Sequence, residues 1–369
     1  MKYLMLKDVC KISMGQSPNS SSYNDNGDGV PFFQGNADFG ERYPITRKWC
    51  NEPTKMANPK DILISVRAPI GAINYAKEEC CIGRGLAALT PDRNKVSPEY
   101  IYWLLKAKNE ELNSKGTGST FKAISRKVLE ETLVPDVDFD KQHEYAKILE
   151  KIYSVIQNRK KELVRFDDFI KARFIEIFGD IRTNSKGWKI VGFKECADID
   201  TNMIHDFKGY ENYPHIGIDS IEKETGKLIG YRTIAEDGVI SGKYLFTSAH
   251  IIYSKIRPNL NKVAMPDFEG LCSADAYPIL VKKDVCNREY FGYILRSKYF
   301  LDYVLAFSNR TNLPKVNKNQ VEGFTLPLPP IEFQNQFADF VHKVNKSKLP
   351  QELCTILQEN SLYKLVKVL

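Results

Sequence analysis

The chain has 369 residues, of which 43% are apolar, and it carries a formal net charge of +7 at pH 7. This length predicts two domains, and the apolar fraction excludes a fully disordered protein. The mild basic excess favours an ordinary, slightly basic protein and a polyanion-binding surface about equally, because no block of Lys and Arg accompanies it.

The cysteines and the apolar runs indicate where the protein works. The eight cysteines are scattered, none in C-x-x-C spacing, and the histidines do not cluster with them, which argues against a zinc site. No segment approaches the ~20 apolar residues of a membrane span, and the start, "MKYLMLKDVCKI", is too short and too charged for a secretion signal. We expect reduced thiols in a cytoplasmic protein that does not bind membranes.

In chain order, each half begins with short β-rich pieces separated by turns, and the pieces occur twice. "DILISVRAPIG" (61–71) matches "HIIYSKIRPNL" (250–260) at an offset of 190 residues. A helix follows at 97–105, with Ser97 as its N-cap and Pro98 at its first position, and it matches 287–295. The offset is too long for a solenoid repeat, so it predicts two whole mixed α+β domains of similar fold.

A polar loop, a short helix and a final strand close each half, and a longer helix follows. Pro135 and Gln142 in "LVPDVDFDKQHEYAKIL" (133–149) match Pro327 and Gln334 at an offset of 192 residues. No Pro or Gly interrupts 136–178, which predicts a helix of ~40 residues and ~60 Å.

An apolar stripe on each long helix predicts that the two helices pack against each other. Its residues lie mostly three, four or seven apart, and we favour an antiparallel pair over two helices that each cover only their own domain. The expected packing residues are Ile148, Ile152, Val155, Leu163, Phe166, Ile170, Ile177, Phe337, Phe340 and Val344. Pro350 is expected to stop or kink the second helix at about Leu349.

Catalytic motifs are missing from the sequence. "GTGSTFK" (116–122) is not a phosphate-binding P-loop, and neither a dinucleotide fingerprint nor a nucleophile elbow occurs. Their joint absence favours a binding or scaffold protein over an enzyme.

Several phrases in order along the chain carry a family resemblance. "GQSP" (15–18), "DILISVRAPIG", "FKAISRKVLEETLVPDVDFDKQHEYAKIL" (121–149) and "RFIEIFGD" (173–180) are similar to phrases of the specificity subunits of type I restriction–modification systems. The resemblance extends over residues 1 to about 348 and recurs in both halves.

The resemblance implies an α+β fold with two similar target recognition domains, joined by long helices that pack as an antiparallel, pseudo-twofold pair. The expected parts are a first recognition domain at 1–138, a central helical spacer at 139–180, a second recognition domain at 181–330 and a C-terminal helical region at 331–369, interrupted at Pro350.

The resemblance also implies a function. Each domain would read one half of a bipartite, asymmetric site in double-stranded DNA, and the helices would set the gap and dock two methyltransferase subunits. Restriction subunits with helicase and nuclease activity are optional further partners. The chain itself would be non-catalytic and bind no cofactor; S-adenosylmethionine, ATP and Mg belong to the partner subunits.

Candidate DNA-binding residues are polar or basic side chains in the matched loops. Arg and Lys pair with guanine, Asn and Gln pair with adenine, and Lys, Arg and Ser contact phosphates. The candidates are Gln16, Ser17, Arg67, Lys115, Ser119, Lys122, Arg126, Lys255, Arg257, Asn309, Arg310, Asn312, Lys315, Asn317 and Lys318.

Two alternatives stay open on the sequence alone. One is a specificity component of another class of DNA modification system. The other is a scaffold protein that uses its two β-rich domains to bind proteins rather than DNA.

Overall fold

In the computed structural model the chain divides into two units, residues 1–162 with 351–369 and residues 163–350. The structure describes residues 2–118, 122–307 and 314–368. Unit 1 and unit 2 below refer to these two parts, and each is described by itself.

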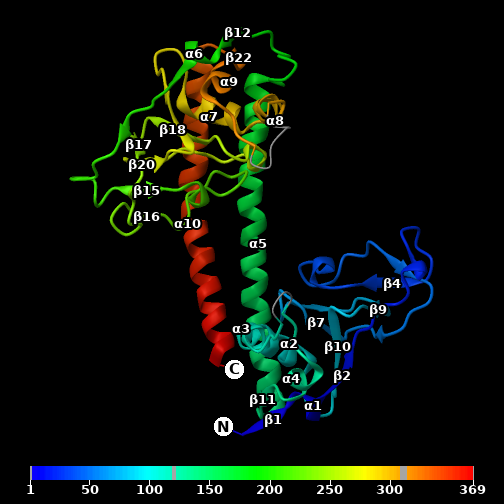
Figure 1. Ribbon diagram of the computed structural model, residues 1–369. Coiled ribbons are helices and arrows are strands. Elements are labelled where there is room, and N and C mark those ends of the chain that lie inside the picture. Colours follow the sequence, from blue (N-terminus) through cyan, green and yellow to red (C-terminus); the bar gives the residue numbers. More distant parts are fainter. Residues whose placement is uncertain (1, 119–121, 308–313, 369) are drawn as a thin grey trace. The chain divides into compact units, whose positions relative to one another are not determined.

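Unit 1 consists of short strands, short helices and the start of a long helix (Figure 1). Its elements are β1 Tyr3–Met5, α1 Leu6–Val9, β2 Cys10–Met14, η1 Ser20–Ser22, β3 Tyr23–Asn24, β4 Val30–Phe33, η2 Asn36–Asp38, β5 Trp49–Cys50, β6 Met56–Ala57, β7 Ile62–Ser65, β8 Ile73–Tyr75, β9 Cys80–Ile82, β10 Leu86–Pro91, α2 Pro98–Ala107, α3 Asn109–Ser114, α4 Arg126–Glu130, β11 Leu133–Pro135 and α5 Phe139–Phe178.

Two sheets and a ribbon form the frame of unit 1. One sheet has the order β2-β10-β7-β8, the other β3-β5-β4-β9-β6, and β1 pairs with β11. Helix α2 packs on the first sheet and buries Tyr100 and Trp103 in the main core. The expected cap is confirmed: the Ser97 side chain accepts a hydrogen bond from the Tyr100 amide, and Pro98 opens the helix.

Unit 2 repeats this plan in the same order. It starts in the second part of α5, and its further elements are β12 Lys189–Gly192, α6 Phe193–Cys196, β13 Ala197–Ile199, β14 Met203–Ile204, β15 Pro214–Ile216, η3 Ile218–Ser220, β16 Arg232–Thr233, β17 Lys243–Phe246, β18 His250–Ser254, η4 Pro258–Leu260, β19 Val263–Ala264, β20 Gly270–Ser273, β21 Ala276–Val281, α7 Arg288–Arg296, α8 Lys298–Leu305, α9 Lys318–Glu322, β22 Thr325–Leu328 and α10 Ile331–Val368.

The sheets of unit 2 match those of unit 1 strand by strand, with one difference. The order β13-β21-β18-β19 corresponds to β2-β10-β7-β8, and the ribbon β12–β22 corresponds to β1–β11. In the second sheet, β16-β15-β20-β17 corresponds to β5-β4-β9-β6, including the parallel pair. The remaining strand is added at opposite ends: β3 lies beside β5, but β14 lies beside β17. The predicted pair of similar α+β domains is therefore confirmed.

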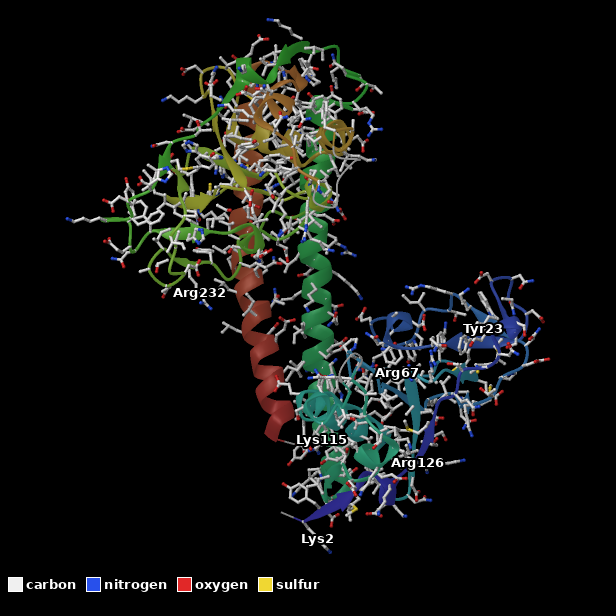
Figure 2. The ribbon with its side chains drawn as sticks, viewed as in Figure 1. Lys2, Tyr23, Arg67, Lys115, Arg126 and Arg232 are labelled. Carbon is white, nitrogen blue, oxygen red and sulfur yellow. The ribbon has the colours of Figure 1, made fainter. Side chains whose placement is uncertain are left out.

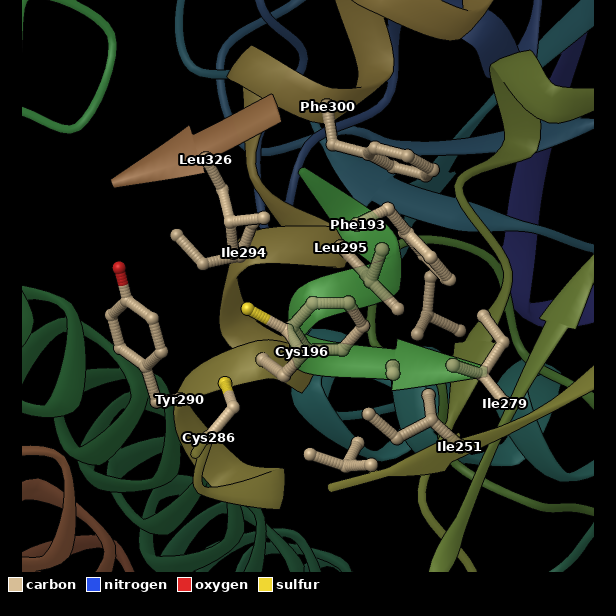
Figure 3. Close-up of a cluster of buried hydrophobic side chains, with 14 of the residues drawn as sticks. Phe193, Cys196, Ile251, Ile279, Cys286, Tyr290, Ile294, Leu295, Phe300 and Leu326 are labelled. Atoms are coloured by element: carbon tan, nitrogen blue, oxygen red, sulfur yellow. The ribbon is translucent and has the colours of Figure 1, made fainter. Parts of the chain in front are cut away.

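The core of unit 2 lies between its first sheet, α6, α7 and the long helices (Figure 3). Phe193, Ile251, Leu295 and the thiols of Cys196 and Cys286 are all fully buried there. All eight cysteines are free, and seven of them are buried. Within the described residues, no helix is long and apolar enough to cross a membrane.

In unit 1, a buried glutamine ties the start of the long helix to the domain. The Gln142 side chain donates from Nε2 to the Val137 carbonyl (2.7 Å) and accepts at Oε1 from the Ser97 amide (2.9 Å). The Tyr100 hydroxyl donates to the Pro135 carbonyl at the end of the last strand (3.4 Å). The Gln142 side chain thereby joins the turn after the last strand and the first turn of α5 to the N-terminus of α2, and Tyr100 joins α2 to the last strand itself.

In unit 2 the same bonds recur at the repeated positions. Gln334 donates to the Pro329 carbonyl (2.7 Å) and accepts from the Asn287 amide (2.8 Å). The Tyr290 hydroxyl donates to the Pro327 carbonyl (2.6 Å). The repeated phrase in the sequence therefore encodes a repeated hydrogen-bonded junction, which we call the glutamine junction.

Within unit 2 the two long helices run antiparallel. The Phe178 and Phe337 rings lie 5.5 Å apart, and Lys348 Nζ lies 2.7 Å from Asp167 Oδ1, so the α5 residue number falls as the α10 number rises. Several of the predicted packing residues are buried or partly buried in this core: Phe166, Ile170, Ile177, Phe337, Phe340 and Val344.

In unit 1 the buried face of α5 differs from the predicted stripe. Ile148 and Val155 are 46% and 39% exposed, and Leu149 and Ile156 are buried instead. Ile152 and Leu163 are half-buried. Ile148 and Val155 thus do not join the packing, because a shift of one residue turns a side chain by about 100° on a helix of 3.6 residues per turn.

Of the predicted stop or kink at about Leu349, the stop is wrong, because α10 runs continuously through Pro350, and the kink stays a prediction. A proline inside a helix removes one hydrogen bond and costs ~3 kcal/mol or more. Buried residues on both sides offset this cost: Val344 is 7% exposed, and Thr355 is 4% exposed with its hydroxyl donating to the Gln351 carbonyl.

The glutamine junction gives a stability prediction. Gln334→Ala leaves the Asn287 amide and the Pro329 carbonyl buried without partners, so the free energy of unfolding should fall by ~1–3 kcal/mol in urea titrations. Gln336→Ala, an exposed glutamine of the same helix, is the control and should change it little. Equal effects of the two substitutions would contradict a structural role for the junction.

Candidate nucleic-acid interface

Three turns of unit 1 cross at one rim of its sheets. The turn between β9 and β10 donates from the Gly83 amide to the Phe33 carbonyl (2.8 Å) and from the Gly85 amide to the Gln34 carbonyl (3.2 Å). The Gly15 amide, directly after β2, donates to the carbonyl of Leu86, the first residue of β10 (2.9 Å). Backbone hydrogen bonds thus hold the ends of β2, β4 and β9 together.

Glycine is required where these turns touch. A Cβ atom on Gly85 would lie 2.4 Å from the Gln34 carbonyl oxygen, and one on Gly15 would lie 2.2 Å from the Gly83 carbonyl oxygen. Real Cβ atoms do not approach backbone oxygens so closely. The turns therefore pack backbone against backbone, and side chains emerge only from the residues beside the glycines.

Those neighbouring side chains are polar. Gln16, Gln34 and Arg84 are exposed, and the Ser17 hydroxyl lies among them. Ser17 Oγ accepts hydrogen bonds from Gln34 Nε2 (2.9 Å) and from the Arg84 amide (3.3 Å). We call Gln16, Ser17, Gln34 and Arg84 the unit 1 rim.

Two further exposed cations join this rim through the backbone. The Val66 amide donates to the Gly85 carbonyl (2.9 Å), and the Ala68 amide donates to the Lys122 carbonyl (3.0 Å), which brings Arg67 and Lys122 beside the turn. Among the described residues, neither side chain has an ion-pair partner. Cations without a carboxylate partner are available to phosphates or base edges.

Lys115 and Arg126, by contrast, are occupied within unit 1. Lys115 Nζ lies 2.6 Å from Glu111 Oε1, and Arg126 Nε lies 2.7 Å from Glu130 Oε1. Figure 2 shows these two side chains on elements other than the one that carries Arg67.

In unit 2 the equivalent rim is made of lysines around one carboxylate. The Lys255 amide donates to the Asp275 carbonyl (3.0 Å), as Val66 does to Gly85 in unit 1. Lys315 Nζ lies 3.3 Å from Asp275 Oδ1, and the buried Lys243 donates to Ser241. Burial lowers the pKa of Lys243, and burial with the nearby Lys315 charge lowers the pKa of Lys255. These lysine charges repel one another and are partly shielded from water. The approach of a polyanion relieves this repulsion, so its binding is favoured.

The remaining predicted residues differ in their surroundings. Arg257 has a left-handed backbone (φ 47°), and its amide donates to the Pro314 carbonyl. The Asn317 side chain caps α9, and Lys318 Nζ donates to the Ile199 carbonyl (3.1 Å), so both make internal bonds. Four predicted residues lie outside the described part of the chain: Ser119, Asn309, Arg310 and Asn312.

Sequence reasoning missed Gln34, Arg84 and Lys243. Arg84 had a local signal, because the flanking glycines in "GRG" (83–85) mark a close backbone approach. Gln34 and Lys243 had none, since each lies beside an ordinary apolar strand. No group of three His, Cys, Asp or Glu side chains that could hold a metal ion occurs within the described residues.

These features define a tandem α+β protein with one polar rim in each repeat. A family model for the type I restriction modification DNA specificity domain matches residues 1–165 and 185–355. The chain therefore belongs to this family.

Named relatives and one solved structure are similar to this chain. The chain is 44% identical over 152 residues to the type I restriction enzyme MjaX specificity subunit of Methanocaldococcus jannaschii, covering 41% of this chain and 36% of that one. It is 29% identical over 283 residues to the EcoDI specificity subunit of Escherichia coli, covering 68% and 63%. These matches span less than two thirds of either relative. The S subunit structure from M. genitalium shares the fold with a TM-score of 0.61 at 12% identity, covering 99% of this chain and 95% of that one.

The crossing of the turns gives a testable prediction. Gly85→Ala should lower the thermal unfolding temperature and weaken DNA binding, because its Cβ would clash with the Gln34 carbonyl. Gly35→Ala is the matched control: its φ of −173° suits any residue, and nothing lies within 4 Å of its Cβ position. Unchanged unfolding and binding in Gly85→Ala would show that the crossing tolerates a side chain.

Proposed function

We propose that this chain is the DNA sequence-recognition subunit of a type I restriction–modification complex. Each unit reads one half of a bipartite site in double-stranded DNA through its rim. The observation that carries this proposal is one repeated frame with two different rims, since a shared frame with unlike reading side chains suits an asymmetric site.

Electrostatics supports DNA as the partner. Unit 1 offers Arg67, Arg84 and Lys122 without ion-pair partners among the described residues, and unit 2 gathers Lys243, Lys255 and Lys315 around one carboxylate. Neutralising phosphates releases counterions, so such rims bind DNA with a steep salt dependence.

The long helices are proposed to set the gap between the half-sites. Helix α5 has 40 residues, a length of ~60 Å, whereas one turn of DNA is roughly 34–36 Å. Each helix starts at a glutamine junction, which ties its first turn to one unit.

The catalytic work is assigned to partner subunits. Two methyltransferase subunits that use S-adenosylmethionine would dock on the helices, and restriction subunits with ATP and Mg would join them. This chain would carry out sequence recognition and no chemistry, in keeping with the family to which it belongs.

Methylome mapping tests the proposal. Deleting the gene should abolish one bipartite adenine-methylated motif from the host genome, and re-introducing the gene should restore it. A triple variant Lys243→Gln, Lys255→Gln, Lys315→Gln should weaken methylation of that motif, because it removes the cations of the unit 2 rim. Lys283→Gln, an exposed lysine of unit 2 between β21 and α7 and outside the rim, is the control.

The same experiment separates the alternatives. Loss of the gene with every methylated motif intact would rule out the proposed function and favour a protein-binding scaffold. Loss of a motif in a genome that encodes no helicase–nuclease subunit would favour another class of modification system.

Assembly provides a second test. Co-purification with the methyltransferase subunit, followed by light-scattering mass measurement, should give two methyltransferases per chain, because the helix start recurs in both units. A complex with one methyltransferase would restrict docking to one unit, and no complex would contradict the partner assignment. The continuity of α10 through Pro350 favours the two-subunit result.

A further inference from the structure

We propose that Arg84 reads a guanine, and so fixes one G·C pair in the half-site that unit 1 recognises. The inference rests on the proposed DNA-reading function and deepens it by naming a specificity-determining side chain.

The backbone on both sides of Arg84 is immobilised. The Gly83 and Gly85 amides donate to the carbonyls of Phe33 and Gln34, and the Arg84 amide donates to Ser17 Oγ. Base readout requires a side chain whose origin is fixed, because a forked contact to a base edge tolerates little displacement. Three consecutive anchored amides provide such an origin.

The guanidinium itself is uncommitted. Arg84 is exposed, and its side chain makes no hydrogen bond, ion pair or ring contact in the described part of the chain. A planar guanidinium whose backbone is held in place, and which has no partner among the described residues, can donate two hydrogen bonds to the O6 and N7 acceptors of guanine in the major groove. Lys115 and Arg126 of the same unit differ, since each is paired with a glutamate.

The neighbours of Arg84 supply a context for readout. Gln16 is exposed, and its backbone is held at both ends: its amide donates to the Ile82 carbonyl (3.0 Å), and its carbonyl accepts from Thr54 Oγ1 (2.6 Å). Its free side-chain amide suits adenine. The Gln34 side chain is held by Ser17, so it acts as a positioning residue for the turn.

The equivalent positions in unit 2 show which residues of the rim belong to the shared fold and which differ between the two units. The parallel pair Phe33–Ile82 of unit 1 corresponds to Ile216–Cys272 of unit 2, so two residues further on Arg84 corresponds to Ala274. By the same pairing, Gln34 corresponds to Gly217.

Unit 2 thus keeps the crossing of strands but has no forked side chain at these two places. A residue that only stabilised the frame would be needed in both units. A residue that reads a base is free to differ, and these positions do differ.

The test uses the full chain in its native host, with its partner subunits, and maps methylation after replacing Arg84. Arg84→Ala should make one G·C position degenerate in one half-site and leave the other half-site unchanged. The preference for G·C over other pairs at that position should fall about 10- to 100-fold. Arg126→Ala, an exposed arginine of the same unit paired with Glu130, should leave the motif unchanged.

Arg84→Gln guards against misfolding, because it keeps a polar side chain of similar length but replaces the guanidinium that pairs with guanine by an amide that suits adenine. Relaxed preference at the same position with this variant supports the inference, even if Arg84→Ala fails to fold. An unchanged motif with Arg84→Gln, or a uniform loss of methylation with a salt slope lower by about 1, would overturn it and make Arg84 a phosphate contact. A wild-type gene that directs no bipartite motif would refute the proposed function instead.

Discussion

The buried glutamine at the start of each long helix is the interaction on which the architecture depends. The first amides and carbonyls at a helix end lack partners within the helix, and an apolar setting makes that costly. Gln142 and Gln334 each satisfy one amide and one carbonyl with a single side chain, where a strand ends and another helix begins. The direction in which each helix leaves its own unit is therefore set by side-chain hydrogen bonds to nearby backbone groups, and not by apolar packing alone.

The repeat made much of this architecture predictable. Matched phrases at offsets of 190 and 192 residues indicated two domains of one fold, and the Ser97–Pro98 cap placed α2 correctly. The buried face of α5 was harder to predict, because neighbouring apolar residues such as Ile148 and Leu149 both fit a helical stripe and only tertiary packing chooses between them. Pro350 misled for a related reason: local propensity predicts a stop, whereas packing on both sides outweighs one lost hydrogen bond.

The candidate interface was less predictable than the fold. Sequence reasoning selects basic and amide residues in loops, but many of those residues are engaged in capping or ion pairs, such as Asn317 and Arg126. Gln34 becomes a candidate only when strand pairing brings 33–34, 15–17 and 83–85 together, which is a long-range event, whereas the glycines of "GRG" mark Arg84 locally. The two rims thus differ in chemistry although their frames agree: forked and amide side chains in unit 1, clustered lysines around Asp275 in unit 2.

The second sheet of each unit ends in very short strands. Its outer strands are β3 and β6 in unit 1 and β14 and β16 in unit 2, and each has two residues. An edge so short offers too few unpaired backbone amides and carbonyls to template the addition of a foreign strand. The second sheet of each unit is thereby protected from edge-to-edge aggregation, and lengthening any of these strands would expose it to that risk.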